Sequence, residues 1–332
     1  MNAAGIWTRL RALVRTQART QARTQARVHP PTPARALAPA VVLACAALQA
    51  ASALAEALPR DELERQCWLQ YTRERTRVRL VEPTAVDVSN LREGYTVQSP
   101  FRVDFSIRGM GVIPAGKQHP KAGHHHLLVN TSLPANPGDQ IPFNDFHRHY
   151  GKGQTSAVLA LPPGQHRIRL LFADHEHRPY FVFSPELRIT VRGPRTAQGP
   201  KVTSTNFDAS CRDWYQDEVS RPRPDGVRVL ITNVRDGEPV VSPVNVRFAV
   251  DGFGVAPKGF GGAAQGHFVL DVLRSEGGTP QNVDLGNGAT QATLLLAPGG
   301  YTLRLRFVDD AGRRDLAPVS ETRITVNGQD RL

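Results

Sequence analysis

Residues 89–112 read SNLREGYTVQSPFRVDFSIRGMGV, and residues 232–255 repeat this pattern as TNVRDGEPVVSPVNVRFAVDGFGV. The two stretches align at an offset of 143 residues. After one loop of different length the likeness resumes at an offset of 135, where Pro163-Gly164 matches Pro298-Gly299. Self-similarity of this length indicates a duplicated structural unit. The chain of 332 residues is long enough for two such domains, each with its own core.

Apolar and polar residues alternate inside each copy. In residues 101–107, Phe, Val, Phe and Ile alternate with Arg, Asp and Ser, and residues 244–250 show the same alternation with polar or small residues. A period of two predicts half-buried antiparallel strands. Turns that contain Gly and Pro separate several such short strands. We therefore predict an all-β fold of two tandem immunoglobulin-like β-sandwich domains, each with a short helical lead-in.

The repeat also predicts the domain boundaries. We expect a signal peptide with a low-complexity basic n-region (1–55), a helical lead-in (56–85), a His-rich β-sandwich domain (86–192), a linker (193–207), a second lead-in (208–226) and a diverged second β-sandwich domain (227–328). Cys67 and Cys211 occupy equivalent places in the two lead-ins, each four residues before a tyrosine. They either form a disulfide between the copies or remain buried free thiols.

The N-terminal segment has the composition of a secretory signal. Seven arginines and no acidic residue accompany an apolar run, and Ala53-Leu54-Ala55 predicts cleavage before Glu56. The run is too short for a membrane span, so we expect a periplasmic or secreted chain with no transmembrane span after cleavage. Val42-Leu43-Ala44-Cys45 leaves a lipoprotein anchored at Cys45 as the alternative.

The charge of the chain does not indicate a nucleic-acid partner. Its formal net charge is +11, but the seven arginines of residues 1–55 supply most of that excess. Because we expect this segment to be removed, the remaining chain is only weakly basic.

Histidine is concentrated in the first copy. Nine of the eleven histidines lie within residues 119–177. The second copy keeps the glycines, prolines and strands of the scaffold, but only His124 has a histidine counterpart, His267. The residues Asn282, Asp284, Asp310 and Gly312 replace His147, His149, His175 and His177. A fold that survives without these histidines does not need them, so we interpret them as one site that the second copy has lost or reshaped.

Strand geometry gives the histidines a direction. Residues two apart on a strand share a face, so His124 with His126, and His147 with His149, each present two imidazoles on one side. The second copy has Phe268 in the place of His125. We therefore expect His125 to face the core and His124 and His126 to turn outward.

This pattern predicts a transition-metal site. Neutral imidazole is the commonest protein ligand for late first-row ions, so copper or zinc is the expected cofactor. The predicted ligands are His124, His126, His147, His149, His175 and His177. His125, His166 and Asp174 are candidates for a supporting shell, although Asp174 is kept as Asp309, which favours a turn residue over a ligand.

The first copy resembles the bacterial family named domain of unknown function 4399. The resemblance is carried by Gly109-Met110-Gly111-Val112, by Gly123-His124-His125-His126 with the apolar residues that follow, and by the segments 147–155, 161–164 and 174–177. It covers about residues 86–192, and the second copy resembles a diverged member. The resemblance implies a secreted domain of the bacterial envelope and no particular activity.

Three functions remain open from the sequence. The first is an exported periplasmic protein that binds or delivers a metal ion. The second is a metal-dependent enzyme. It is less favoured because no nucleophile motif is present and Gly151, Gly153 and Gln154 stand where a carboxylate ligand is expected after His147-x-His149. The third is a non-catalytic module with structural histidines that contacts an envelope protein.

Overall fold

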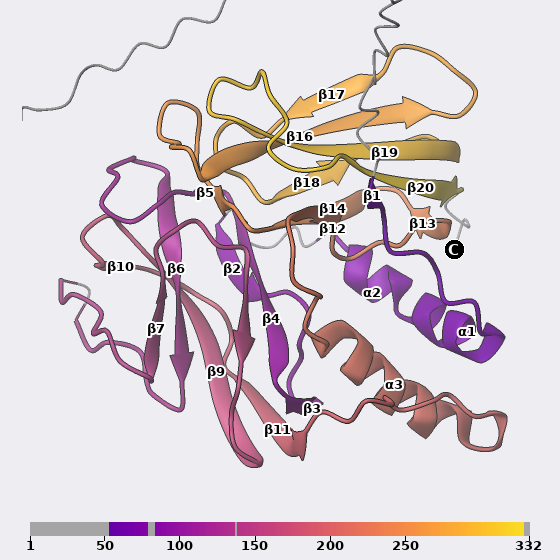
Figure 1. Ribbon diagram of the computed structural model, residues 1–332, viewed down its shortest axis with the longest axis horizontal. Coiled ribbons are helices and arrows are strands. Elements are labelled where there is room, and N and C mark those ends of the chain that lie inside the picture. Colours follow the sequence, from indigo (N-terminus) through magenta and orange to yellow (C-terminus); the bar gives the residue numbers. More distant parts are fainter. Residues whose placement is uncertain (1–52, 79–83, 137, 329–332) are drawn as a thin grey trace, which may run out of the picture. The chain divides into compact units, whose positions relative to one another are not determined.

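The computed structural model describes residues 53–78, 84–136 and 138–328. Most of the predicted signal peptide, including Cys45, lies outside these residues. The described chain forms two tandem β-sandwiches with little helix, which confirms the predicted fold class (Figure 1). Among the described residues, no helix combines the length and the apolar composition needed to cross a membrane.

The first sandwich is built from two sheets. The larger sheet has the order β3-β11-β9-β6-β5, with β10 beside β9 and β7 beside β6, and the smaller has the order β2-β4-β8. The strands are β2 (Ala85–Val88), β3 (Thr96–Ser99), β4 (Phe101–Arg108), β5 (Gly111–Val112), β6 (Ala122–Val129), β7 (His147–Tyr150), β8 (Ser156–Leu159), β9 (Gly164–Ala173), β10 (Pro179–Phe183) and β11 (Leu187–Pro194).

The second sandwich repeats most of this topology, but among the described residues it has no counterpart of β10 and it gains β1 beside β20. Its larger sheet has the order β1-β20-β19-β16-β15, with β13 beside β20 and β17 beside β16, and its smaller sheet has the order β12-β14-β18. The strands are β1 (Ala53–Leu54), β12 (Arg228–Ile231), β13 (Glu238–Val241), β14 (Val244–Asp251), β15 (Gly254–Val255), β16 (Gln265–Arg274), β17 (Gln281–Asp284), β18 (Gln291–Leu294), β19 (Gly299–Val308) and β20 (Ser320–Asn327).

The period-two pattern places the cores. Phe101, Val103, Phe105 and Ile107 on β4 are all buried, and they belong to the same core as Leu127 and Val129 on β6 and alternate residues of β9. In the second copy the alternate residues of β14 are buried in the same way, namely Val244, Val246, Phe248 and Val250. Burial of these apolar side chains contributes roughly 1.5–3 kcal/mol each, which fixes the register of the alternating strands.

The lead-ins are helical. They consist of α1 (Glu62–Gln70) and α2 (Thr72–Thr76) before the first sandwich, and of the short 3₁₀ helix η1 (Ser204–Asn206) and α3 (Phe207–Ser220) before the second. The Asp61 carboxylate accepts a hydrogen bond from the Glu64 N–H at 3.0 Å and caps α1. Cys67 on α1 and Cys211 on α3 form a disulfide, and the Tyr71 and Tyr215 rings stack with centroids 4.0 Å apart.

The N-terminal end of the described chain lies against the second sandwich. β1 pairs in parallel with β20, and the Asp236 N–H donates to the Glu56 carbonyl at 2.9 Å. Glu56 also forms an ion pair with Arg235. The predicted cleavage after Ala55 would remove β1 and leave both Glu56 contacts in the mature chain.

The two sandwiches contact each other reciprocally. The Val112 N–H donates to the Gly288 carbonyl, and the Val255 N–H donates to the Gly153 carbonyl, both at 2.8 Å. Gly153 has a φ of +83°, and a Cβ there would lie 2.2 Å from the Val255 carbonyl oxygen, so only glycine fits this contact. Equivalent residues of the two copies thus face one another.

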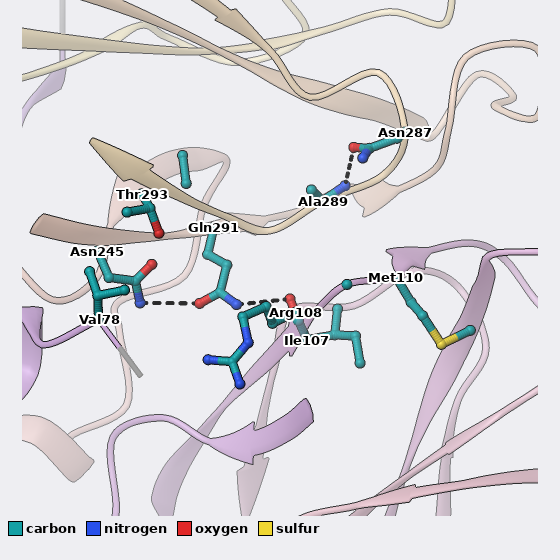
Figure 2. Close-up of a pocket in the computed structure, with 11 residues that line it drawn as sticks. Val78, Ile107, Arg108, Met110, Asn245, Asn287, Ala289, Gln291 and Thr293 are labelled. Carbon is teal, nitrogen blue, oxygen red and sulfur yellow. Dashed lines mark hydrogen bonds between the residues drawn. The ribbon is translucent and has the colours of Figure 1, made fainter. Parts of the chain in front are cut away.

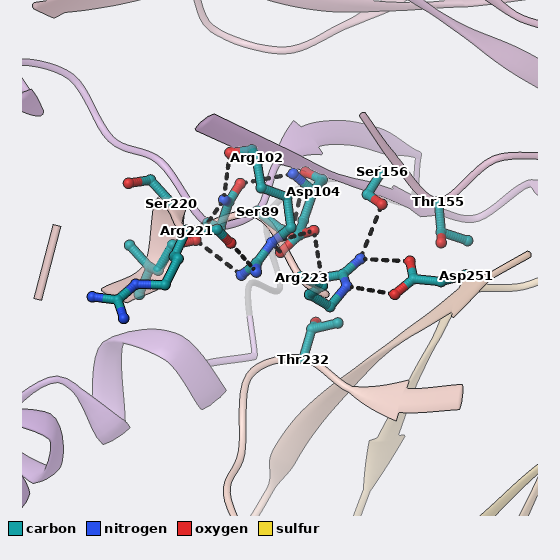
Figure 3. A network of polar contacts seen from close by, with 12 residues as sticks. Ser89, Arg102, Asp104, Thr155, Ser156, Ser220, Arg221, Arg223, Thr232 and Asp251 are labelled. Carbon is teal, nitrogen blue, oxygen red and sulfur yellow. Dashed lines mark hydrogen bonds and ion pairs between the residues drawn. The ribbon is translucent and has the colours of Figure 1, made fainter. Parts of the chain in front are cut away.

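Polar side chains also join the two sandwiches. Arg223 follows α3 and donates to Asp251, Asp104 and Ser156 at 2.9–3.1 Å (Figure 3). Gln291 on β18 donates to the Ile107 carbonyl and accepts from Asn245, both at 3.2 Å (Figure 2). The cavity of about 220 Å³ beside Gln291 is lined without histidine.

Candidate metal centre

Strand β6 carries the first part of the site. His125 points into the core, where its ring lies 5.1 Å from Phe105 and 5.0 Å from Phe172 between ring centroids. His124 and His126 point to the opposite face of the sheet, as predicted. Both are nevertheless completely buried, because a segment between β6 and β7 covers that face. The outward direction was right, but the outer face here is not exposed to solvent.

Two further histidines reach His124 and His126. β7 pairs with β6 so that His149 lies directly opposite His126. His177 lies in the turn between β9 and β10, and its ring contacts those of His124, His126 and His149. Among the four rings, His124, His126, His149 and His177, the centroids lie 4.8–5.9 Å apart. We call these four residues the histidine cluster.

The separations within the histidine cluster suit a shared ion. The Nε2 atoms of His124 and His126 are 3.1 Å apart, and one ring nitrogen from each of His124, His149 and His177 lie within 4.8 Å of one another. Two nitrogens bound to one zinc ion at about 2.0–2.1 Å in tetrahedral geometry lie about 3.3 Å apart. Three of the rings thus present nitrogens close enough to share one ion, and His126 lies beside them with its Nε2 facing that of His124.

The histidine cluster contains unpaired nitrogens, as do His125 in the core and His267 in the second sandwich. Nδ1 of His124 and His126 and Nε2 of His149 and His177 are buried without a hydrogen-bond partner among the described residues. A buried polar atom without a partner costs about 1–3 kcal/mol, so four together are expensive to retain. Coordination through Nε2 of His149 and His177 would give those two nitrogens a partner, whereas Nδ1 of His124 and His126 would stay unpaired, because it is their Nε2 atoms that face each other.

Burial keeps the imidazoles neutral. Desolvation, together with the neighbouring histidines, lowers the pKa of His124 to about 3 and of His126 to about 2. The pKa of His149 is lowered by burial and by His177. Their lone pairs are therefore free to bind a metal at neutral pH.

Local backbone geometry positions two of the four imidazoles. A Cβ at Gly151 would lie 2.2 Å from Nε2 and Cε1 of the His149 ring, so glycine at this position makes room for the imidazole. His177 has a φ of +64°, in the left-handed region that favours glycine. The turn is held by Asp174, whose Oδ1 accepts from the N–H groups of Glu176 and Arg178.

The remaining predicted site residues lie outside the histidine cluster. His147 shares the strand face of His149, but it lies opposite Leu128 and its Nδ1 is 3.1 Å from the Asn144 side-chain oxygen. His175 is half-buried in the turn, and its carbonyl accepts from the Gly116 N–H. His125 faces the core, and His166 pairs with Asn130 and the Pro162 carbonyl. Asp174 acts as the turn residue described above.

Two features of the site were not predicted from the sequence. One is the role of Gly151, and the other is Phe143, whose ring lies 4.9 Å from that of His149 and 4.8 Å from that of His177. For Phe143 the sequence did contain a signal, which was the unequal loop length of the two copies. The extra residues of the first copy lie between β6 and β7.

The second sandwich shows what the same scaffold does without the cluster. His267, Val269, Asp284 and Gly312 stand at the four equivalent positions. Lys258, which replaces Ala115, forms an ion pair with Asp284, and His267 Nε2 is 3.6 Å from the same carboxylate. The Lys258 methylenes lie 2.7–3.0 Å from where a Cβ at Gly286 would stand. A lysine side chain thus occupies the space above Gly286 that the His149 ring takes above Gly151.

Comparison with solved structures returns proteins of several kinds. They include CopC from Methylosinus trichosporium OB3b (20% identity, 32% of this chain and 99% of that chain, TM-score 0.21). Fibronectin(III)-like modules of Clostridium thermocellum CbhA match at 10% identity over 74% of this chain and 96% of that chain, with a TM-score of 0.20. A two-domain fibronectin type III segment of chicken tenascin matches at 13% identity over 74% of this chain and all of that chain, with a TM-score of 0.20. None of these likenesses reaches a TM-score of 0.5.

A search of curated proteins finds no match to the chain. The model of one family, the domain of unknown function (DUF4399), matches residues 103–192 and again residues 246–329. The two regions fall in the two sandwiches and together make up just over half of the chain. The chain is therefore a member of the DUF4399 family and contains two tandem copies of its domain.

Proposed function

We propose that this protein is an exported metal-binding protein whose first sandwich holds one copper or zinc ion through the histidine cluster. The observation that carries the proposal is the contrast between the two copies. Four imidazoles converge in the first sandwich, those of His124 and His126 fully buried and those of His149 and His177 half-buried, whereas the second sandwich keeps the fold with one histidine and a Lys258–Asp284 ion pair.

The donor set supports a late first-row ion. All four groups are neutral nitrogen donors, and among the described residues none of them forms an ion pair with a carboxylate. Calcium and magnesium require oxygen ligands, which the cluster does not offer. Copper and zinc both accept four imidazoles, and the role that follows is binding or delivery of the ion.

A titration of the full chain, prepared without an affinity tag, tests the proposal. We expect one equivalent of Cu(II) or Zn(II) to bind tightly. Replacing His177 by the residue of the second copy, His177→Gly, should weaken binding by more than the about 10–100-fold typical of losing a supporting residue, because a ligand is lost. The matched control is His166→Tyr, which also introduces the second-copy residue but lies outside the cluster. Absence of tight binding, or equal loss in both variants, would refute the site.

Export is tested separately. Intact-mass spectrometry of protein from an envelope fraction should give a chain that begins at or near Glu56. A chain that retains residues 1–35 would contradict export by this signal, and a diacylglyceryl increment on Cys45 would establish the lipoprotein alternative.

A further inference from the structure

Phe143 lies on the solvent side of the histidine cluster. Its ring centroid is 4.9 Å from that of His149, 4.8 Å from that of His177 and 6.2 Å from that of His126. The residue is 60% exposed, so the ring has one side on the imidazoles and the other in water. Single exposed apolar residues are common on protein surfaces, so the feature that distinguishes Phe143 is its contact with three imidazoles of the cluster and not its exposure.

The residues before and after Phe143 in the chain fix its backbone in this place. Ile141, two residues earlier, is 1% exposed and packs against Leu128, Leu171 and Ala173 on the outer face of the sheet. Its N–H donates to the His177 carbonyl at 2.9 Å. On the other side, the Asn144 side chain accepts from the N–H groups of Phe146 and His147 at 2.9 and 3.0 Å. Phe143 is thus fixed between an apolar anchor and a capped turn.

The second sandwich shows that the fold does not require this segment. Residues 130–146 connect β6 to β7, whereas only residues 275–280 connect the equivalent strands β16 and β17. The sandwich that has lost the cluster therefore also lacks the extra residues and the aromatic ring. The segment accompanies the histidines and is not required by the scaffold.

We propose that Phe143 is a cover that sets the rate at which the ion enters and leaves the histidine cluster. This inference rests on the proposed metal binding. An ion leaves a four-imidazole site fastest when water or an incoming ligand can approach it as a nitrogen departs. An apolar ring across the solvent side blocks that approach, and the hydrophobic shell of a metal site controls access in this way.

The test measures ion transfer from the loaded full chain. Protein carrying one equivalent of Zn(II) or Cu(II) is mixed with excess EDTA, and the release rate is followed by stopped flow. Phe143→Ala should release the ion about 10-fold faster or more, and Phe143→Leu, which keeps an apolar cover, should stay close to the native rate. Phe146→Ala is the matched control, because Phe146 is 54% exposed in the same segment and makes no ring contact with the cluster among the described residues.

The outcomes separate the two proposals. Native protein that holds no ion refutes the metal site and the cover together. Native protein that holds its ion, with equal release rates in Phe143→Ala and the native chain, overturns the cover and leaves the metal site standing. Equal acceleration in Phe143→Ala and Phe146→Ala also overturns it, since the effect would then belong to the whole segment.

Discussion

His177 shows how a single residue can reveal a site. It adopts a left-handed backbone conformation with a φ of +64°, and the second copy has Gly312 with a φ of +71° at the same position. The turn thus favours glycine, and a residue with a Cβ costs about 1 kcal/mol there. A strained residue with a buried unpaired nitrogen is retained for its side chain and not for stability.

We expect His177→Gly to change stability and binding in opposite directions. The metal-free variant should gain about 1 kcal/mol in free energy of unfolding as the backbone strain is released, while tight copper or zinc binding is lost. Urea unfolding in the presence of a chelator, with metal titration alongside, measures both. The reciprocal variant Gly312→His should be destabilised by a similar amount. A metal-free His177→Gly protein less stable than the native chain would contradict this account.

His125 carries a second prediction at this scale. Both of its ring nitrogens are buried without a partner among the described residues, and burial lowers its pKa to about 3. In the second copy Phe268 takes this place between Phe248 and Phe307. We expect His125→Phe to raise the free energy of unfolding by about 1–3 kcal/mol and to leave metal affinity unchanged.

The same variant should alter the response to acid. In the unfolded chain His125 takes up a proton near pH 6.5, whereas in the folded chain it does so only near pH 3. The unfolded state therefore binds more protons between these values, and His125 costs up to about 1.4 kcal/mol of stability per pH unit as the pH falls below 6.5. Urea unfolding from pH 7.5 to 5 should show a shallower decline in His125→Phe. An unchanged slope would show that His125 does not titrate in this way.

For the strands, the sequence predicted the face to which a side chain points, but it did not predict which side chains come close together. The alternation in residues 101–107 predicted β4, and Phe268 predicted that His125 would face the core. Alternation alone cannot tell His147 from His149, because the two point the same way about 6–7 Å apart along the strand. The pairing of β7 with β6 makes that choice by setting His149 opposite His126. The segment that covers this face has no periodicity to predict its path.

A graft of the site tests whether these elements are sufficient. The variant Lys258→Ala, Val269→His, Asp284→His, Gly312→His introduces all the first-copy residues at the equivalent positions. We expect the full chain to bind a second equivalent of metal. The triple variant that retains Lys258 should not, because the lysine fills the space above Gly286 and places a positive charge beside the ion. Equal stoichiometry in both grafts would show that Lys258 does not matter.

The whole molecule is a pair of sandwiches tied by contacts between equivalent residues. The disulfide joins one lead-in to the other, the stacked tyrosines follow it, and Arg223 bridges Asp104 and Asp251. The sequence predicted the cysteine pair as one of two alternatives. It could not predict Arg223, since an arginine near a helix end has no pattern that indicates its distant partners.

Removing the disulfide should therefore affect the whole chain and not the site. The bond closes a loop across 144 residues of sequence, and the double variant Cys67→Ser, Cys211→Ser should lose about 2–5 kcal/mol in free energy of unfolding. Metal affinity should stay at the native value, because neither cysteine contacts the histidine cluster. Urea unfolding and metal titration measure the two, and reductant added to the native chain should reproduce the loss. An unchanged free energy of unfolding would contradict this expectation.

The turn after β7 contributes to the histidine cluster and to the contact between the two sandwiches. Gly151 gives space to the His149 ring, and two residues later Gly153 touches the backbone of Val255 in the other sandwich. Space for a histidine of the cluster and a contact between the two sandwiches thus depend on two glycines of one short turn. The second sandwich, which has no such cluster, packs against this turn through Val255. The contact between the sandwiches therefore also holds the turn against which the His149 ring lies.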